Sequence, residues 1–494
     1  MRQRLLLITL SLVATVSIYA QSTRQGAKGQ ELPNTPAGQQ MAAWLRVFNS
    51  GRTDNLRHFI SENYPQSALS KISIDDRTAK DAGLYVRTQG LDLRRIEKSE
   101  SDAIVVLAQE RLDEGWVRIN IAVESVAPHR ITEFGIRRIS RPADAGVAKK
   151  LSEAEVLKDI DAYLKRMLAT DQFSGAVLIA RNGKPVFEKA YGLASKAFNV
   201  PNRIDTKFNL ASMNKMFTAV AIAQLAERGK VSFDDPIIKY LPDFPNKSVA
   251  EKVTIHQLLT HTSGMGDFFN EKFEAQKTRL RAVQDYFPLF VNDRLSFEPG
   301  QKWQYSNAGF IVLGAIIEKV SGQNYFDYVR DHIYKPAGMI DTDSYETDRE
   351  VVNRAIGYTE IGPSNRAEPG PLRNNLIINP VKGSPAGGGY STVEDMLRFG
   401  IALRTHKLLN ERFTDLVLKG KVEVGRPNER YAYGFMEGQT NGVHIVGHGG
   451  TSPGANAKFD MYPELGYTVI VLSNYDPRSA ERVADRFRER VTRK

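Results

Sequence analysis

The chain carries the stretch Asn209-Leu210-Ala211-Ser212-Met213-Asn214-Lys215, which leads directly into the run Met216-Phe217-Thr218-Ala219-Val220-Ala221-Ile222-Ala223-Gln224-Leu225. The run has the composition of a buried helix and is closed by Gly229. Residues three apart share a helix face, so Ser212 and Lys215 point into the same space. A serine hydroxyl is a poor nucleophile until a base takes its proton, and a buried lysine can be neutral enough to do so. The spacing therefore indicates a nucleophile and a candidate base at the start of a buried helix, where the field of the helix N-terminus also acts.

Two later stretches carry polar residues beside apolar elements. Tyr305-Ser306-Asn307 precedes an apolar helix expected over residues 309 to 317, and His448-Gly449-Gly450-Thr451 follows an alternation over residues 443 to 446. Three more phrases accompany them: Leu258-Leu259-Thr260-His261-Thr262-Ser263-Gly264, Lys335-Pro336-Ala337-Gly338-Met339 and Gly388-Gly389-Tyr390-Ser391-Thr392. Together the motifs resemble the penicillin-recognising serine hydrolases, in the branch that holds class C β-lactamases, DD-peptidases and family VIII esterases. The resemblance extends from about residue 155 to the C-terminus.

The resemblance implies roles for four side chains. Ser212 attacks the substrate, Lys215 and Tyr305 move protons, and Asn307 orients Lys215 and the substrate amide. A free phenol has a pKa near 10. Tyr305 can therefore serve only if cations such as Lys215 favour its ionised form, or if it acts jointly with Lys215.

The last motif is expected to hold the developing oxyanion. Its donors would be the backbone N–H groups of Ser212 and Thr451. Gly449 and Gly450 would leave room for a substrate against the strand edge. The resembled family has a lysine or a histidine at the first position of this triplet, and His448 is of the second type, which offers less positive charge near pH 7. We therefore expect an esterase or a peptidase acting on D-amino-acid peptides rather than a true β-lactamase, working without a cofactor.

The fold class expected from these patterns is α+β, with an antiparallel sheet flanked by helices and a helical subdomain, as in the β-lactamase/transpeptidase fold. Two stretches, residues 174 to 180 and 185 to 190, read as a hairpin across Asn182-Gly183. Further alternation over residues 442 to 446, 458 to 462 and 467 to 472 completes the sheet from the far end of the domain. The region between, about 230 to 430, reads as mostly helical and loop-rich.

Two helices are expected at the ends of this domain. The first runs from Ser152 to Ala169, with Ser152 as its N-cap. The second, from Ser479 to Arg493, presents an apolar stripe to the sheet and turns its arginines to solvent.

The N-terminal part reads as a separate small domain. Residues 1–20 have the basic and apolar regions of a secretory signal, and residues 21–38 form a polar linker. Residues 39–140 are expected to form a small α+β roll, with a helix from about Ala37 to Phe48, a second short helix and strand-like alternations. The alternations lie at residues 84 to 86, 91 to 97, 103 to 108, 117 to 123 and 131 to 139. Asp75-Asp76 reads as a turn rather than a catalytic pair. Residues 141–150 are the expected linker to the hydrolase domain, 151–494.

Composition agrees with an ordinary globular protein, since 41% of the 494 residues are hydrophobic and 25% are charged. The net charge of +10 comes from basic residues spread along the chain, which argues against nucleic-acid binding. The chain has no cysteine, so it can form no disulfide. We expect a periplasmic or secreted protein that contacts a membrane only if the signal segment is retained. The oligomeric state is left open.

Other interpretations of single motifs are weaker. Gly450-Thr451-Ser452-Pro453-Gly454 matches the G-x-S-x-G elbow of α/β-hydrolases, but Pro453 has no N–H for the oxyanion. His444 and His448 have the spacing of metal ligands on a helix, yet their stretch reads as a strand followed by a glycine turn, so no metal site is expected. His261 is expected to be a structural hydrogen-bonding residue, and residues 266 to 287 to form part of the pocket rim. The remaining alternative is a binding or sensing protein that keeps the fold and has lost turnover.

Overall fold

The computed structural model describes residues 31–139, 141–142, 150–362, 371–476 and 478–493. By their internal contacts, residues 1–146 and 147–494 form two compact units. The division falls inside the expected linker, most of which lies outside the described residues, as do the expected signal segment and the first part of the linker that follows it. In the part of the chain that is described, no helix is both long enough and apolar enough to span a membrane.

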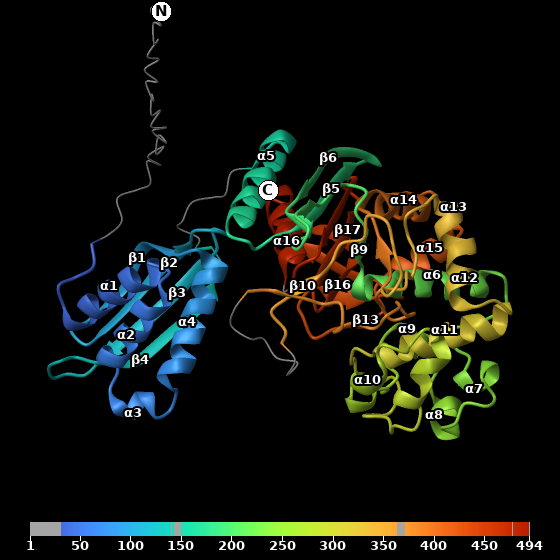
Figure 1. Ribbon diagram of the computed structural model, residues 1–494, viewed down its shortest axis with the longest axis horizontal. Coiled ribbons are helices and arrows are strands. Elements are labelled where there is room, and N and C mark those ends of the chain that lie inside the picture. The colour runs from blue at the N-terminus through green and yellow to red at the C-terminus, as the bar shows by residue number, and fades with distance from the viewer. Residues whose placement is uncertain (1–30, 140, 143–149, 363–370, 477, 494) are drawn as a thin grey trace, which may run out of the picture. The chain divides into compact units, whose positions relative to one another are not determined.

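The first unit consists of four helices followed by a four-stranded antiparallel meander (Figure 1). The helix α1 begins at Pro36, where the Thr35 side chain accepts a hydrogen bond from Gly38 N. Its predicted apolar stripe, including Trp44 and Phe48, is buried against the sheet side that carries Ile119. The elements are α1 (Pro36–Asn49), α2 (Thr53–Asn63), α3 (Gln66–Leu69), α4 (Ile74–Thr88), β1 (Leu91–Ser99), β2 (Ala103–Glu110), β3 (Trp116–Val123) and β4 (Ile131–Ile139).

Three details of this unit differ from the sequence prediction. The helix α1 starts inside the expected linker 21–38. Residues 84 to 86 belong to α4 rather than to a strand, because a three-residue alternation is too short to distinguish the two periods. Asp75 and Asp76 lie in the first turn of α4, where Ser73 caps the helix and negative charge is favoured, instead of in a free turn.

The second unit contains a large sheet, helices on both of its faces and a helical subdomain (Figure 1). Its first part contains α5 (Glu153–Ala169), β5 (Gly175–Arg181), β6 (Lys184–Tyr191), β7 (Leu193–Ser195), β8 (Val200–Pro201), β9 (Phe208–Asn209), the 3-10 turn η2 (Ala211–Met213) and α6 (Asn214–Glu227). The middle part contains α7 (Ile237–Tyr240), α8 (Lys247–Lys252), α9 (Ile255–Leu259), α10 (Glu271–Gln276), η3 (Val283–Leu289), α11 (Asn307–Ser321), α12 (Tyr325–Val329), the π-helical turn η4 (Arg330–Tyr334) and α13 (Lys335–Ala337). The last part contains β10 (Tyr358–Thr359), β11 (Arg373–Asn374), β12 (Tyr390–Ser391), α14 (Val393–Arg404), α15 (Glu411–Leu418), β13 (Val422–Glu423), β14 (Glu429–Tyr431), β15 (Met436–Thr440), β16 (Val443–Ser452), β17 (Ala455–Tyr462), β18 (Tyr467–Ser473) and α16 (Ser479–Val491).

The large sheet joins the two ends of the domain. Its strand order is β13-β14-β15-β16-β17-β18-β5-β6, and every neighbouring pair is antiparallel. The hairpin β5–β6 turns at Asn182 and Gly183, both with positive φ, as an Asn-Gly turn of type I′ requires. The predicted fold class is therefore confirmed, including the antiparallel sheet completed by distant segments.

Helices cover both faces of this sheet. Phe487 of α16 packs against Tyr467, whereas Gly400 of α14 lies against Thr468. Because adjacent strand residues point to opposite faces, α16 and α14 cover opposite sides. The helix α5 packs beside α16, and Ser152 caps α5 in the predicted capping box.

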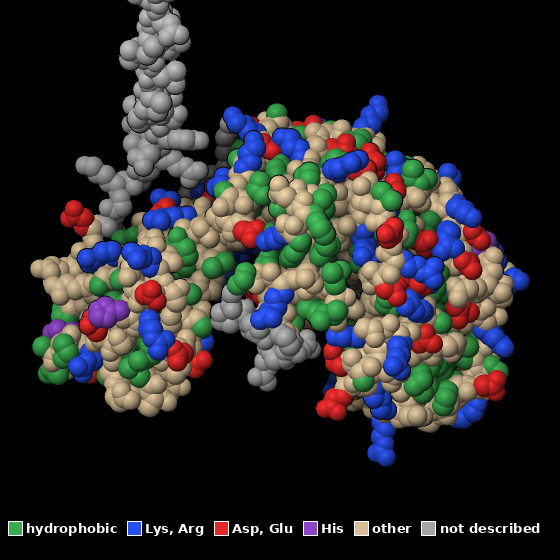
Figure 2. Space-filling model, in the orientation of Figure 1, with side chains coloured by type: hydrophobic (Ala, Val, Ile, Leu, Met, Phe, Trp, Pro, Cys, Tyr) green, Lys and Arg blue, Asp and Glu red, His purple; other side chains and the backbone are tan. Residues whose placement is uncertain are grey.

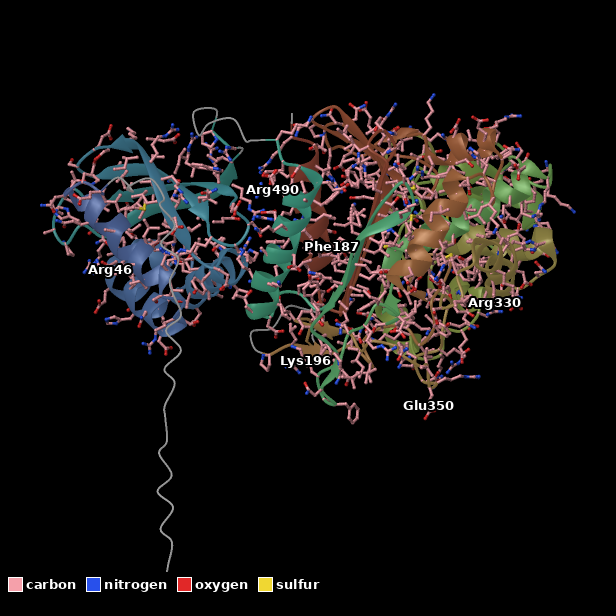
Figure 3. The ribbon with its side chains drawn as sticks, turned by 90° about the horizontal axis from the view of Figure 1, so that it is seen from above. Arg46, Phe187, Lys196, Arg330, Glu350 and Arg490 are labelled. Carbon is pink, nitrogen blue, oxygen red and sulfur yellow. The ribbon has the colours of Figure 1, made fainter. Side chains whose placement is uncertain are left out.

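The arginines of α16 correct the expectation that they all face solvent. Arg486 donates two hydrogen bonds of 2.7 Å to Asp159 of α5. Arg490, which is labelled in Figure 3, donates a third of 3.2 Å to the same carboxylate. Both guanidinium groups are buried beside this carboxylate. The sequence pattern could not reveal this pairing because Asp159 belongs to a helix at the other end of the domain.

Charges of both signs are mixed on the face of the molecule drawn in Figure 2, where basic and acidic side chains lie interspersed over both units. This agrees with the even spread of basic residues along the sequence.

The division into two units leads to a testable prediction. Every catalytic motif lies in the second unit, so we expect residues 150–494 to fold and to hydrolyse an ester alone. Limited proteolysis of the whole protein should release a stable, active C-terminal fragment, identified by mass. A fragment that is well folded yet inactive would show that the first unit contributes to the site.

Candidate active site

The candidate nucleophile lies in a tight turn just before a buried helix. Ser212 is the middle residue of η2, and α6 begins two residues later. Ala211 has a φ of +44°, which an L-residue adopts only under constraint. Hydrogen bonds on both sides hold it: Ala211 N donates to Asn209 Oδ1 at 2.8 Å, and Ala211 O accepts from Gly388 N at 3.1 Å. The turn places Ser212 and Lys215 on a common side, as the sequence predicted, although Ser212 belongs to a 3-10 turn rather than to the helix itself.

Lys215 is completely buried behind the serine. Its Nζ donates to Asn307 Oδ1 at 2.6 Å and to the Ala386 carbonyl at 2.5 Å, and it lies 3.3 Å from Ser212 Oγ. Burial lowers the pKa of Lys215 to about 7, although the negative charge of Asp267 acts in the opposite direction. A large fraction of Lys215 is therefore neutral near pH 7, which allows it to accept the serine proton.

Tyr305 lies beside the same two residues. Its phenol shares a hydrogen bond with the Ser212 side chain, and its ring centroid is 4.7 Å from Lys215 Nζ. Burial raises the pKa of Tyr305 above its usual value, against the effect of the Ser212 hydrogen bond. Of the two possibilities left open by the sequence, this environment favours a neutral phenol that acts jointly with Lys215 over an ionised base.

Asn307 connects the lysine to an acidic residue. It is the first residue of α11, whose N-cap is Ser306. Its Oδ1 accepts from Lys215, and its Nδ2 donates to Asp267 Oδ2 at 2.7 Å. The sequence reasoning placed Asp267 only in the rim segment and missed this link, because no local pattern connects Asp267 with Asn307.

The candidate oxyanion strand passes next to the nucleophile turn. The strand β16 continues through Ser452, so the expected glycine turn after His448 is wrong. Among the described residues, β16 pairs with β15 only as far as Gly447 and with β17 along its whole remaining length. Thr451 is therefore on a stretch whose outer edge is unpaired, and this edge is available to an extended substrate.

The structure requires a glycine at position 450 for a different reason from the one expected. A Cβ at this position would lie 2.1 Å from Leu210 O and 3.1 Å from Ala211 Cβ. Glycine thus allows β16 to approach the nucleophile turn closely, rather than leaving space for substrate. At Gly449 the nearest atom to an added Cβ would be 3.6 Å away, so close packing imposes no such demand there.

His448 is buried on the nucleophile side of β16. Its Nδ1 lies 2.5 Å from Gly449 O and its Nε2 lies 3.0 Å from the Tyr431 hydroxyl. A proton on Nδ1, donated to Gly449 O, leaves Nε2 to accept from Tyr431. Burial, assisted by the charge of Lys215, lowers the pKa of His448 to about 3. His448 is therefore neutral at pH 7, and Tyr431 is a site residue that the sequence reasoning did not identify.

His261 lies behind the site. Its Nδ1 accepts from Ser306 N at 3.1 Å, and its ring centroid lies 4.2 Å from that of Tyr305, with the two rings tilted by 35°. Burial, and then the charges of Lys215 and His448, lower its pKa well below the usual value. These contacts agree with the structural role expected for His261.

The competing serine lacks a catalytic environment. Ser452 Oγ is buried, and within the described chain it has no hydrogen-bond partner. The carbonyl of the next residue, Pro453, accepts from Asn375 Nδ2 and Asn379 Nδ2, which anchors the turn into β17.

A cavity of about 710 Å³ elsewhere in this unit, between residues 194–206 and 347–356, is lined by none of the candidate catalytic residues. In the described ranges, no three potential metal-ligating side chains gather at one place.

The fold and this site define a class of protein. A Ser-x-x-Lys pair opens a buried helix, and a sheet strand passes the serine, with a helical subdomain supplying Tyr305 and Asn307. This is the arrangement of the β-lactamase/transpeptidase-like serine hydrolases. The Beta-lactamase family model matches residues 160–494, and the chain belongs to that family.

Individual relatives agree with this assignment. Penicillin-binding protein 4* of Bacillus subtilis is 32% identical over 328 residues, which cover 64% of this chain and 71% of that protein. The crystal structure of a penicillin-binding protein from Bacillus halodurans is similar with a TM-score of 0.59 and 33% identity, over 69% of this chain and 99% of the other. The D-amino acid amidase of Ochrobactrum anthropi shares the fold, with a TM-score of 0.57, 23% identity and coverage of 68% and 98%. The family resemblance inferred from the motifs is thus confirmed.

Proposed function

We propose that this protein is a secreted serine hydrolase that forms an acyl-enzyme on Ser212 with a small amide or ester substrate. The observation that carries the proposal is Lys215 Nζ, buried 3.3 Å from Ser212 Oγ with its pKa lowered to about 7. Secretion rests on the sequence of residues 1–20 alone. The substrate would be an ester or a D-amino-acid amide or peptide, a class that includes the substrate named for one structural relative.

The proposed reaction has two halves. Ser212 Oγ attacks the substrate carbonyl carbon, and its proton passes to neutral Lys215, with the Tyr305 phenol able to relay it. The N–H groups of Ser212 and Thr451 stabilise the oxyanion of the tetrahedral intermediate. When this intermediate collapses, the bond to the leaving group breaks and the leaving group takes the proton back. Water then attacks the acyl-enzyme and gives a proton to the same groups. The bond between Ser212 Oγ and the acyl carbon breaks, Ser212 Oγ takes this proton, and the acid is released.

The test of this function is covalent labelling. The protein is incubated with a fluorophosphonate and, separately, with a labelled penicillin, and the adduct is located by mass. An adduct on Ser212 together with turnover of a nitrophenyl ester supports the hydrolase. A penicillin adduct that forms without turnover of any ester would favour the binding or sensing alternative.

The neutral state of His448 predicts a substrate preference. A lysine at this position would offer a fixed positive charge to the carboxylate of penicillins and stem peptides, whereas neutral His448 does not. A lost charge partner in a partly buried site lowers affinity by roughly ten- to a hundredfold. We expect clear hydrolysis of short-chain aryl esters and weak or no hydrolysis of penicillins.

The substitution His448→Lys examines this preference directly. The ratio of kcat/KM for a chromogenic cephalosporin to that for a nitrophenyl ester should rise in the variant. Using the ratio removes any general loss caused by the missing Tyr431 hydrogen bond. A wild-type protein that turns over the cephalosporin more efficiently than the ester would contradict the charge argument.

A further inference from the structure

The catalytic cluster ends in an exposed carboxylate. Asn307 accepts from Lys215 through Oδ1 and donates to Asp267 through Nδ2, so one amide side chain separates Asp267 from the lysine that contacts Ser212. Asp267 itself is exposed, and its other oxygen, Oδ1, accepts from Phe268 N at 2.7 Å. A negative charge thus stands at the exposed end of this cluster, within one side chain of the reacting groups.

The three basic residues described around the site direct their side-chain nitrogens to partners other than Asp267. Lys215 is buried and directs its Nζ to Asn307, Ala386 and Ser212. His448 is held as a neutral ring between Tyr431 and Gly449 O. Lys458 of β17 lies opposite Gly449, on the α16 face of the sheet, and pairs with Asp460 at 3.2 Å. Among the described charged groups of this cluster, Asp267 is therefore the exposed one that a substrate at Ser212 can reach.

We propose that Asp267 binds the ammonium group of the substrate, so that the enzyme selects amino-acid amides and esters whose amine is unblocked. This inference rests on the proposed acyl transfer at Ser212. An ammonium close to the scissile carbonyl would donate to Asp267 while the carbonyl carbon faces Ser212 Oγ. Acylation of the amine removes its charge, and a carboxylate in its place would be repelled. Asp267 is in this way a residue that determines specificity rather than one that takes part in proton transfer.

The test compares matched substrates with the whole protein at pH 7. Phenylalanine p-nitroanilide, in both enantiomers, is compared with its N-acetyl derivative in the wild type and in Asp267→Asn. The substitution keeps an oxygen to accept from Asn307 and removes the charge. We expect wild type to favour the free amine, and Asp267→Asn to lower kcat/KM for that substrate about ten- to a hundredfold while leaving the N-acetyl substrate nearly unchanged.

Two further variants distinguish charge recognition from a general effect. Asp267→Glu keeps the charge and should recover part of the preference for the free amine. Glu464→Gln removes an exposed charge in the turn between β17 and β18, outside the rim segment, and should leave the preference as in wild type. Equal losses for both substrates in Asp267→Asn would show that Asp267 only positions Asn307 and Lys215, and would overturn the proposal. So would a wild-type protein that prefers the N-acetyl substrate.

A separate measurement keeps the two proposals distinguishable. Nitrophenyl acetate and the fluorophosphonate carry no amine, so their reaction at Ser212 reports acyl transfer alone. If both react in wild type but the amine preference is absent, only the role of Asp267 fails. If neither reacts, the proposed function fails, and this inference fails with it.

Discussion

Replacing Ser212 by alanine should abolish covalent labelling and lower kcat/KM for a nitrophenyl ester by roughly three to six orders of magnitude. The alternative to an acyl-enzyme is direct attack by water, which lacks the positioned nucleophile. The loss of Oγ leaves Lys215 with Asn307 and Ala386 as acceptors, so the buried amine stays hydrogen-bonded and the fold should survive. Thermal unfolding of the variant checks that expectation.

The matched control is Ser452→Ala. Ser452 is the serine of the G-x-S-x-G stretch, it is buried without a partner in the described structure, and it is followed by a proline that has no N–H. Most of the wild-type activity should remain in this variant. A fluorophosphonate adduct on Ser452 of the wild-type protein would contradict the assignment of Ser212.

Replacing Lys215 by methionine should lower kcat/KM by about two to four orders of magnitude, the usual contribution of a general base. Methionine is similar in length and uncharged, so it fits a site where the lysine is completely buried. Lys207→Met is the matched control, because Lys207 is also buried yet pairs with Asp341 outside the catalytic cluster. Its activity per folded molecule should stay near that of the wild type.

The pH dependence gives a second readout for Lys215. The base form is the neutral amine, and burial lowers its pKa from 10.5 to about 7. In wild type, kcat/KM should therefore rise as pH increases through about 7 and level off above it. Tyr305 and His448 do not account for such a rise, since burial moves the pKa of Tyr305 upward and that of His448 to about 3. In Lys215→Met the rise near pH 7 should disappear; if it persists unchanged, another group is the base.

Local sequence predicted several elements well. The Asn182-Gly183 pair identified the β5–β6 hairpin, and Ser152 identified the start of α5, because turn and cap chemistry depend on a few adjacent residues. Short sequence patterns gave wrong predictions where the same residues are compatible with two different structures. Residues 84 to 86 alternate like a strand but continue α4, and the arginines of α16 look like a solvent-facing set until Asp159 is brought beside two of them.

For the candidate site as well, the sequence predicted some residues and only the structure revealed the contacts between them. The order of the motifs identified Tyr305, Asn307 and the strand of Thr451 as partners of Ser212, although they are far from it in the sequence. The links that complete the cluster remained hidden: Asp267 on Asn307, the Ala386 carbonyl on Lys215, and Tyr431 on His448. Each joins segments that no periodicity relates. Gly450 was noticed, but its close approach to Leu210 could be seen only once β16 lay against the nucleophile turn.

By itself, the sequence determined that Ser212 and Lys215 share one side of a helix start, since three residues make nearly one turn whatever surrounds them. It also determined the family, because the motifs and the distances between them can be identified in the sequence directly. The tertiary structure decided what these residues can do. Lys215 has a pKa near 7 only because distant segments bury it, and this desolvation depends on atoms brought together from across the fold. The neutral state of His448 and the link from Asp267 to Asn307 have the same origin, because both depend on neighbours that folding supplies.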